Sequence, residues 1–98
     1  MQSVIIGVGR VGLRTARVLR EEGHDVTVIE ADPAIAGRAR EAGFDVIEGD
    51  GSRESVLESA GVDDAAAVGA LTGDLNVNFA ACLIGKHHGC RTVMRIDE

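Results

Sequence analysis

The feature that most limits the possible folds is a regular alternation of short β-forming runs with helical stretches that end on a glycine. The β-forming runs are residues 3–7, 25–30, 45–48, 66–71 and 91–96. The helical stretches between them end on Gly23, Gly43, Gly61 and Gly89. Glycine just past a helix end adopts a left-handed conformation that other residues resist. Strands that alternate with helices in this way are typical of βαβ units and a parallel sheet.

We therefore predict an α/β fold, with a three-layer doubly wound parallel sheet that is Rossmann-like. Because crossovers between parallel strands are right-handed, five strands are expected in the order 3-2-1-4-5. A length of 98 residues suits one domain, over residues 1–98. The last predicted strand ends two residues before the end of the sequence, so we expect a module or a fragment of a longer protein.

The helices carry their own start signals and apolar faces. In the first helix, Val11, Thr15, Val18 and Leu19 fall on one side, which we expect to be the inner face. The second helix is predicted to begin with Asp32 as N-cap and Pro33 in the first turn, with Ile35, Ala39 and Ala42 facing inward. Ser52 is the expected cap of the third helix, which would pack through Val56 and Leu57.

The fourth predicted helix, residues 74–88, is apolar around most of its circumference. Nearly every residue between Leu75 and Ile84 is apolar. A helix of this kind is buried on more than one side. The pattern leaves two explanations open, a partner chain or a further segment of the same protein.

Composition excludes several classes of function. A net charge of −6 argues against a nucleic-acid binder, and the lack of Trp and Tyr argues against stacking platforms for single strands. No apolar run approaches a membrane span, and the N-terminus lacks the basic region of a signal peptide. Two cysteines, Cys82 and Cys90, form no disulfide framework and favour a reducing cytosol.

A glycine fingerprint lies where the first strand meets the first helix. Gly7, Gly9 and Gly12 form the pattern GxGxxG, which follows an apolar strand and opens an amphipathic helix. Gly7 would permit the tight turn, Gly9 would let a pyrophosphate approach the backbone, and Gly12 would let helix and strand pack closely. A phosphate there meets free N–H groups and the positive end of the helix dipole. The alternative is a glycine-rich turn that binds nothing.

Glu30 ends the second predicted strand, 18 positions after Gly12. A carboxylate at this place accepts hydrogen bonds from both ribose hydroxyls and repels a 2′-phosphate. No Arg or Lys occurs at 31–36 to offset that repulsion, so NADP is disfavoured. Glu30 thus indicates an adenosine ligand without distinguishing NAD from ATP, ADP or AMP.

Further candidates follow strands or lie in the fingerprint. Arg10 would neutralise phosphate charge, or else it is a solvated arginine. Asp50–Gly51 and Thr72–Gly73 follow the third and fourth strands, where ligands bind in open α/β sheets, although these residue types also favour turns. His87, His88 and Cys90 resemble a metal cluster, but a helix C-terminus explains the histidines better, and we predict no metal site. We identify no catalytic residue.

Four segments of the chain resemble the TrkA-N, or RCK/KTN, domains of Trk-type potassium-uptake regulatory subunits. They are VIIGVGRVG, EEGHDVTVIEADP, DVIEGDGSRESVLESAGVDDAAAVGALTGDLNVN and RTVMRI, and together they span nearly the whole sequence. The stretch from GDGS to ALTGD is more diagnostic than GxGxxG, because ordinary dehydrogenases do not share it.

The resemblance implies a nucleotide site and assigns its residues. The phosphate loop corresponds to Gly7, Val8, Gly9, Arg10 and Val11, and the ribose-binding acid corresponds to Glu30, where aspartate is commoner in the family. The turn beside the adenine corresponds to Asp50 and Gly51, the loop after the fourth strand to Thr72 and Gly73, and a final arginine to Arg95.

The resemblance also implies a regulatory rather than an enzymatic function. Such domains bind NAD(H) or ATP/ADP and assemble as homodimers or rings beneath a membrane-embedded potassium-translocating subunit. The expected location is cytoplasmic, at the inner face of the cell membrane, and the expected dimer contact is the apolar helix between Leu75 and Ile84. Two alternatives are a fragment of an NAD-dependent oxidoreductase and the same sensor attached to an antiporter or a phosphoesterase.

Overall fold

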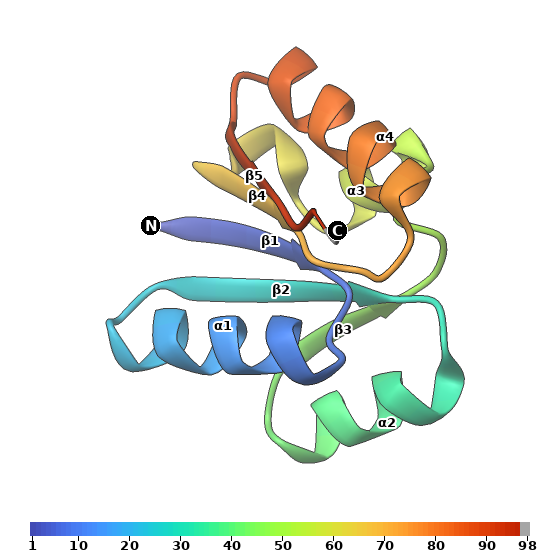
Figure 1. Cartoon of the computed structure of the whole chain (residues 1–98). Helices are drawn as coiled ribbons and strands as arrows, with labels where there is room; N and C mark the ends of the chain where they lie inside the picture. The colour runs from blue at the N-terminus through green and yellow to red at the C-terminus, as the bar shows by residue number, and fades with distance from the viewer. Residues whose placement is uncertain (97–98) are drawn as a thin grey trace.

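A five-stranded parallel sheet with helices on both faces forms the fold of the computed structural model, which describes residues 1–96 (Figure 1). The elements along the chain are β1 (Gln2–Ile6), α1 (Arg10–Glu21), β2 (Asp25–Glu30), α2 (Pro33–Glu41), β3 (Asp45–Glu48), α3 (Glu54–Ser59), the 3₁₀ turn η1 (Val62–Asp64), β4 (Ala67–Ala70), α4 (Leu75–His87) and β5 (Arg91–Met94). The strand order is β3-β2-β1-β4-β5, with every pair parallel. The predicted fold class and strand order are therefore confirmed.

Two apolar cores separate the three layers. Helices α1 and α2 cover one face of the sheet, and α3 and α4 cover the other (Figure 1). Because successive strand residues point to opposite faces, Ile5 of β1 packs with Ala16 and Val28, whereas Ile6 packs with Leu57 on the other side. All five of these side chains are buried.

The predicted inner face of α1 is wrong for two residues. Val11 and Val18 are 40% and 51% exposed, and the buried residues of α1 are Gly12 and Ala16. Leu19 is half-buried against the core, as expected. At Gly12 the helix lies so close to the Gly7 backbone that no side chain fits, and Ala16 is fully buried. A pattern of large apolar residues does not detect contacts made by such small residues.

The helix start signals are confirmed for α2 and wrong for α3. Asp32 accepts hydrogen bonds from the N–H groups of Ala34 and Ile35. The third helix instead begins at Glu54 with Arg53 as N-cap. Ser52 does not cap it, because its hydroxyl and its N–H both donate to the Asp50 carboxylate, at 2.6 and 2.9 Å. The four glycines expected to end helices all have positive φ.

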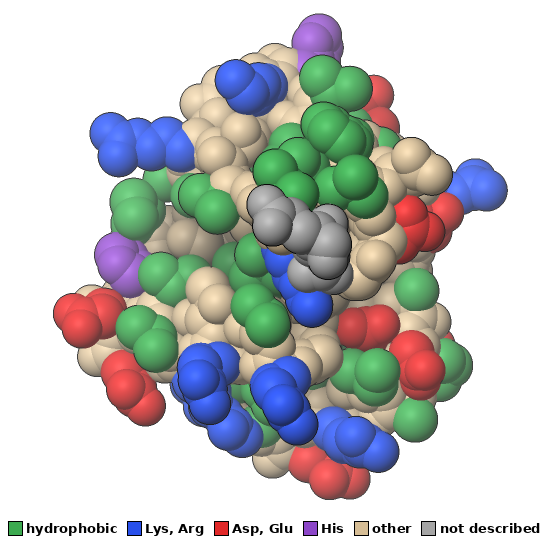
Figure 2. All heavy atoms as spheres, viewed as in Figure 1, with side chains coloured by type: hydrophobic (Ala, Val, Ile, Leu, Met, Phe, Trp, Pro, Cys, Tyr) green, Lys and Arg blue, Asp and Glu red, His purple; other side chains and the backbone are tan. Residues whose placement is uncertain are grey.

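Helix α4 is buried on its sheet side and exposes an apolar stripe on the other. Leu75, Phe79 and Leu83 repeat every four residues and are 43%, 52% and 68% exposed. Figure 2 shows hydrophobic side chains gathered over this helix. Neither α4 nor any other helix within residues 1–96 has both the length and the apolar character needed to cross a bilayer.

Candidate functional site

Two neighbouring hollows open at the carboxyl edge of the sheet. One has a volume of about 240 Å³, and its lining includes Gly51 of the loop after β3 and Val77 of α4. The other, of about 200 Å³, reaches Gly9 and Arg95. Gly7, Glu30 and Thr72 line both hollows, so the loops after β1, β2 and β4 meet at one place. This edge is where ligands bind in doubly wound sheets.

The glycine loop has the geometry that its fingerprint predicts. Gly7 has a φ of +88°, and a Cβ on it would lie 2.8 Å from the Thr72 Cγ2 atom. A Cβ on Gly9 would meet nothing within 4 Å, so the space beside its backbone is open. Gly9 is also the N-cap of α1, and no side chain caps this helix. The first N–H groups of α1 therefore remain available to an anion.

Gly12 fixes how closely α1 packs on the loop. A Cβ at this position would lie 1.7 Å from the Gly7 carbonyl oxygen, a distance that no side chain can occupy. Because the clash is with backbone, a rotamer change would not relieve it. Val11, its neighbour, lies on the exposed side of α1.

The Glu30 carboxylate connects two of the loops. Its Oε1 atom accepts from the Val8 N–H at 2.9 Å, and its Oε2 atom accepts from the Asp32 N–H at 3.0 Å. Each carboxylate oxygen has two lone-pair sites, so both retain capacity for a ribose hydroxyl. Glu30 thus holds the glycine loop in place and also presents acceptors to the hollows that it lines.

Arg10 belongs to a basic region beside the glycine loop. It lines a third hollow, of about 270 Å³, together with Gly9 and Arg38. In Figure 2, basic side chains gather over α1 and α2. The first turn of α1 contains no acidic residue, so no intrahelical carboxylate neutralises this end. The sequence analysis missed Arg38, because only the fold brings α2 beside the glycine loop.

Gly51 and Asp50 have different surroundings. Gly51 is buried and lines the larger hollow, and a Cβ on it would lie 2.4 Å from the Ile6 Cγ2 atom. The Asp50 carboxylate instead turns toward Ser52 and Arg53, with its Oδ2 atom 3.7 Å from the Arg53 Nε. Hydrogen bonds from Ser52 lower the pKa of Asp50. Asp50 therefore orders the turn after β3.

The loop after β4 is held by a residue that the sequence analysis did not single out. Asn78 of α4 is buried, and its Oδ1 atom accepts from the Thr72 N–H and hydroxyl at 3.1 and 2.7 Å. Gly73, next to Thr72, lines the smaller hollow together with Arg95. The sequence signal that could have identified Asn78 is its position as an amide within a largely apolar helical stretch.

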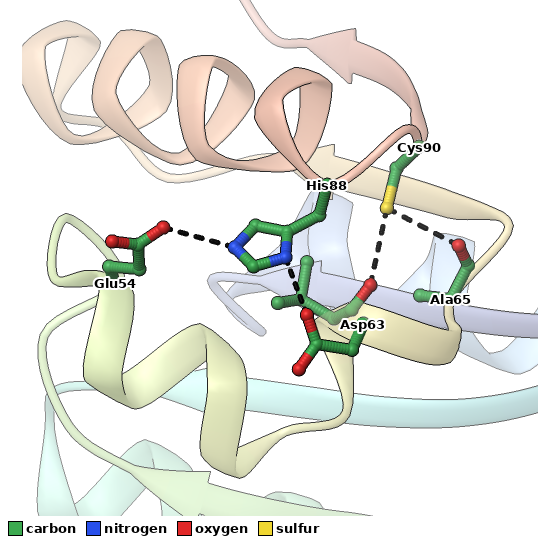
Figure 3. Close-up of polar contacts among 6 residues, drawn as sticks. Glu54, Asp63, Ala65, His88 and Cys90 are labelled. Carbon is green, nitrogen blue, oxygen red and sulfur yellow. Dashed lines mark hydrogen bonds and ion pairs between the residues drawn. The ribbon is translucent and has the colours of Figure 1, made fainter.

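His88 lies apart from these hollows and bridges two carboxylates (Figure 3). Its Nδ1 atom is 2.6 Å from the Asp63 Oδ1, and its Nε2 atom is 3.0 Å from the Glu54 Oε2. Nearby, the Cys90 thiol donates to the carbonyl oxygens of Val62 and Ala65. Within residues 1–96, no group of three or more His, Cys, Asp and Glu side chains is arranged to hold a metal ion.

The His88 bridge predicts a stability that depends on pH. The hydrogen bond to Glu54, followed by the interactions with Asp63, raises the pKa of His88 above 6.5. The resulting stabilisation is complete below the unfolded-state pKa and is lost as the pH rises through the higher folded-state pKa. We expect the free energy of unfolding in urea to fall more steeply above pH 6.5 for the native protein than for His88→Ala. His87→Ala is the control, since His87 is exposed. Parallel pH profiles for native protein and His88→Ala would contradict this account.

The sheet order and the open glycine loop define the class as a Rossmann-like domain with a dinucleotide-type fingerprint. Residues 3–98 match the model of the TrkA-N domain. The chain belongs to the TrkA-N domain family.

Curated relatives support this membership along the whole chain. A protein of Pyrococcus horikoshii named Trk system potassium uptake protein TrkA homolog is 42% identical over 102 aligned positions, covering 100% of this chain and 44% of the relative. The Trk system potassium uptake protein TrkA of Mycobacterium tuberculosis is 35% identical, covering 100% of this chain and 46% of the relative. The chain thus spans less than half the length of these relatives.

Solved structures share the fold at low sequence identity. A structure described as the Shewanella denitrificans Kef CTD in AMP bound form superposes with a TM-score of 0.86 at 22% identity, covering 100% of this chain and 60% of that one. The NAD(P)-binding domain of an exopolyphosphatase-related protein from Archaeoglobus fulgidus gives 0.84 at 20% identity, covering 98% and 73%. The TrkA-N domain of the Escherichia coli inner membrane protein YbaL gives 0.71 at 17% identity, covering 94% and 84%.

Proposed function

We propose that this chain is a nucleotide sensor without catalytic activity, which binds NAD(H) or an adenine nucleotide and thereby controls a membrane potassium transporter. The observation that carries the proposal is the junction of the two hollows. There the Glu30 carboxylate, the open backbone at Gly9 and the uncapped start of α1 lie at one edge of the sheet. These three features together suit a ribose and a phosphate.

The assigned contacts extend along the ligand. Gly7, Val8, Gly9 and Arg10 would bind the phosphates, and Glu30 would bind the ribose. Gly51 and the turn that Asp50 orders would lie beside the adenine. Thr72, Gly73 and Arg95 would meet the part of the ligand beyond the first phosphate, because they line the hollow on the Gly9 side.

NAD(H) is our first choice of ligand, with ATP, ADP and AMP as alternatives. The Glu30 charge disfavours a 2′-phosphate and hence NADP. Two structures of the same fold are described as AMP-bound and as an NAD(P)-binding domain, which agrees with an adenosine ligand.

The proposed effector is taken from the names of the curated relatives. Trk potassium uptake proteins match the chain along its whole length, so the proposed partner is a potassium-translocating membrane subunit and the proposed location is its cytoplasmic side. A ligand that binds two conformations with different affinity shifts their populations, and this shift would alter transport.

The exposed stripe of α4 is the proposed homodimer contact. Beside this stripe, Phe79 and Leu83 line a hollow with Thr92 and Met94 of β5, so the apolar surface continues onto the β5 edge. Apolar side chains grouped in this manner mark interaction surfaces. A dimer formed here, or a larger ring, would bury residues that water otherwise covers.

Potassium uptake in cells lacking the gene tests the proposal. Uptake at low external potassium should fall, and the native gene should restore it whereas a Glu30→Ala gene should not. Normal uptake in the deletion strain would favour the alternative effectors, an antiporter or a phosphoesterase. Hydride transfer to a ketone or quinone by the full-length protein would instead establish the oxidoreductase alternative.

Arg10→Ala should separate phosphate recognition from adenosine recognition. We expect roughly tenfold weaker binding of NAD, ADP and ATP, with a much smaller change for adenosine, because the guanidinium is assigned to phosphate alone. Calorimetric titration measures each affinity, and Arg14→Ala, one turn further along α1, is the matched control. Equal losses for adenosine and for the phosphorylated ligands would refute the assignment of Arg10.

A further inference from the structure

Asn78 is the most deeply buried amide in the described part of the chain and lies next to the proposed ligand site. Asn78 is 1% exposed and lies on α4 among apolar residues that include Val77 and Ala81. A buried amide costs free energy unless its donors and its acceptor are paired. The side chain therefore has a defined set of partners.

These partners belong to two separate loops. The Oδ1 atom accepts from the Thr72 N–H and hydroxyl, and the Nδ2 atom donates to the Thr72 carbonyl oxygen at 3.0 Å. The Nδ2 atom also donates to the Arg95 carbonyl oxygen at 3.2 Å. One side chain thus binds the loop after β4 and the segment after β5.

The two loops meet the ligand hollows but leave the sheet at different points. Thr72 lines both hollows, and Arg95 lines the smaller one. The last bond of the strand ladder between them runs from the Arg95 N–H to the Ala70 carbonyl oxygen. Beyond that bond, the Asn78 amide links the two segments by donating to the carbonyl oxygens of Thr72 and Arg95.

We propose that Asn78 is a positioning residue that holds the Thr72 loop in its ligand-binding conformation and couples that loop to the segment after β5. Ligand contacts at Thr72 would order Asn78, and its amide would transmit this order to Arg95. The ligand arm of this inference rests on the proposed function. The positioning arm does not, because the hydrogen bonds exist without a ligand.

Amide hydrogen exchange on Asn78→Ala, with and without saturating NAD or AMP, tests both arms. Asn76→Ala is the matched control, since Asn76 is an exposed residue of the same type on the same helix. In the native protein we expect ligand to slow exchange at the glycine loop, at Thr72 and at residues 93–96. In Asn78→Ala we expect protection at the glycine loop to persist and protection at 93–96 to disappear, with affinity reduced roughly tenfold.

Asn78→Asp provides a second variant of nearly the same size. Its carboxylate keeps acceptors for Thr72 but cannot donate to the Arg95 carbonyl, so ligand protection at 93–96 should again be lost. Persistent protection there in both variants would overturn the coupling. If native protein binds none of NAD, NADH, ATP, ADP and AMP, the proposed function fails, and the ligand-free comparison still decides the positioning arm. In the ligand-free comparison, unchanged exchange of the Thr72 amide in Asn78→Ala would overturn the claim that Asn78 positions the Thr72 loop.

Discussion

Replacing Gly12 with alanine is expected to lower the free energy of unfolding by about 3 kcal/mol or more. The new Cβ would lie 1.7 Å from the Gly7 carbonyl oxygen, and relief requires moving α1 away from the glycine loop. Overpacking of a core typically costs about 1–3 kcal/mol, and a clash against backbone lies at or above the upper end of that range. A domain of this size has only about 5–15 kcal/mol of total stability.

Urea unfolding followed by circular dichroism measures this effect, and the chain offers a matched control. Gly37 lies inside α2, and a Cβ on it would meet nothing within 4 Å. Gly37→Ala should therefore stabilise the protein by about 0.5–1 kcal/mol, through helix propensity alone. A Gly12→Ala protein as stable as the native one would show that the close approach of α1 to the glycine loop is wrong.

Glu30→Ala is expected to weaken NAD, ADP, AMP and adenosine by a similar factor, on the order of 100-fold. All four ligands present the same ribose, and hydrogen bonds to a charged acceptor are the stronger kind. The variant also leaves the Val8 and Asp32 N–H groups without their carboxylate acceptor, so some loss of stability accompanies the loss of affinity.

Calorimetric titration of the folded variant with each ligand measures the loss. The matched control is Glu48→Ala, because Glu48 pairs with Glu30 in the sheet register and its carboxylate is exposed beside Arg40. Glu48→Ala should bind every ligand as the native protein does. A loss confined to one ligand would contradict the assignment of Glu30 to the ribose.

Local sequence patterns predicted most of the fold because each element carries its own signal. The strands are short β-forming runs, and the glycines that end helices have no substitute with the same freedom at positive φ. Patterns of large apolar residues misassigned the inner face of α1, since the contact is made by Gly12 and Ala16. The prediction of Ser52 as the cap of α3 was wrong because its N–H and its hydroxyl both donate to the carboxylate of Asp50, two residues earlier.

The candidate site was predictable where its residues follow strands. Gly7, Glu30, Gly51 and Thr72 could be brought together from the order of the sheet alone, and the structure places them around joined hollows. Arg38 and Asn78 were not predictable in this way. Their proximity to the site depends on how α2 and α4 pack, and a single sequence carries no direct record of such contacts.

Calorimetric titration of the purified native protein, stripped of carried-over nucleotide, tests the central claim most directly. The panel is NAD, NADH, ATP, ADP and AMP, with NADP as the ligand that Glu30 should reject. Our account predicts micromolar binding of at least one adenosine ligand, discrimination within the panel and no comparable binding of NADP. Absence of binding to every ligand in the panel would contradict the claim that this chain is a nucleotide sensor.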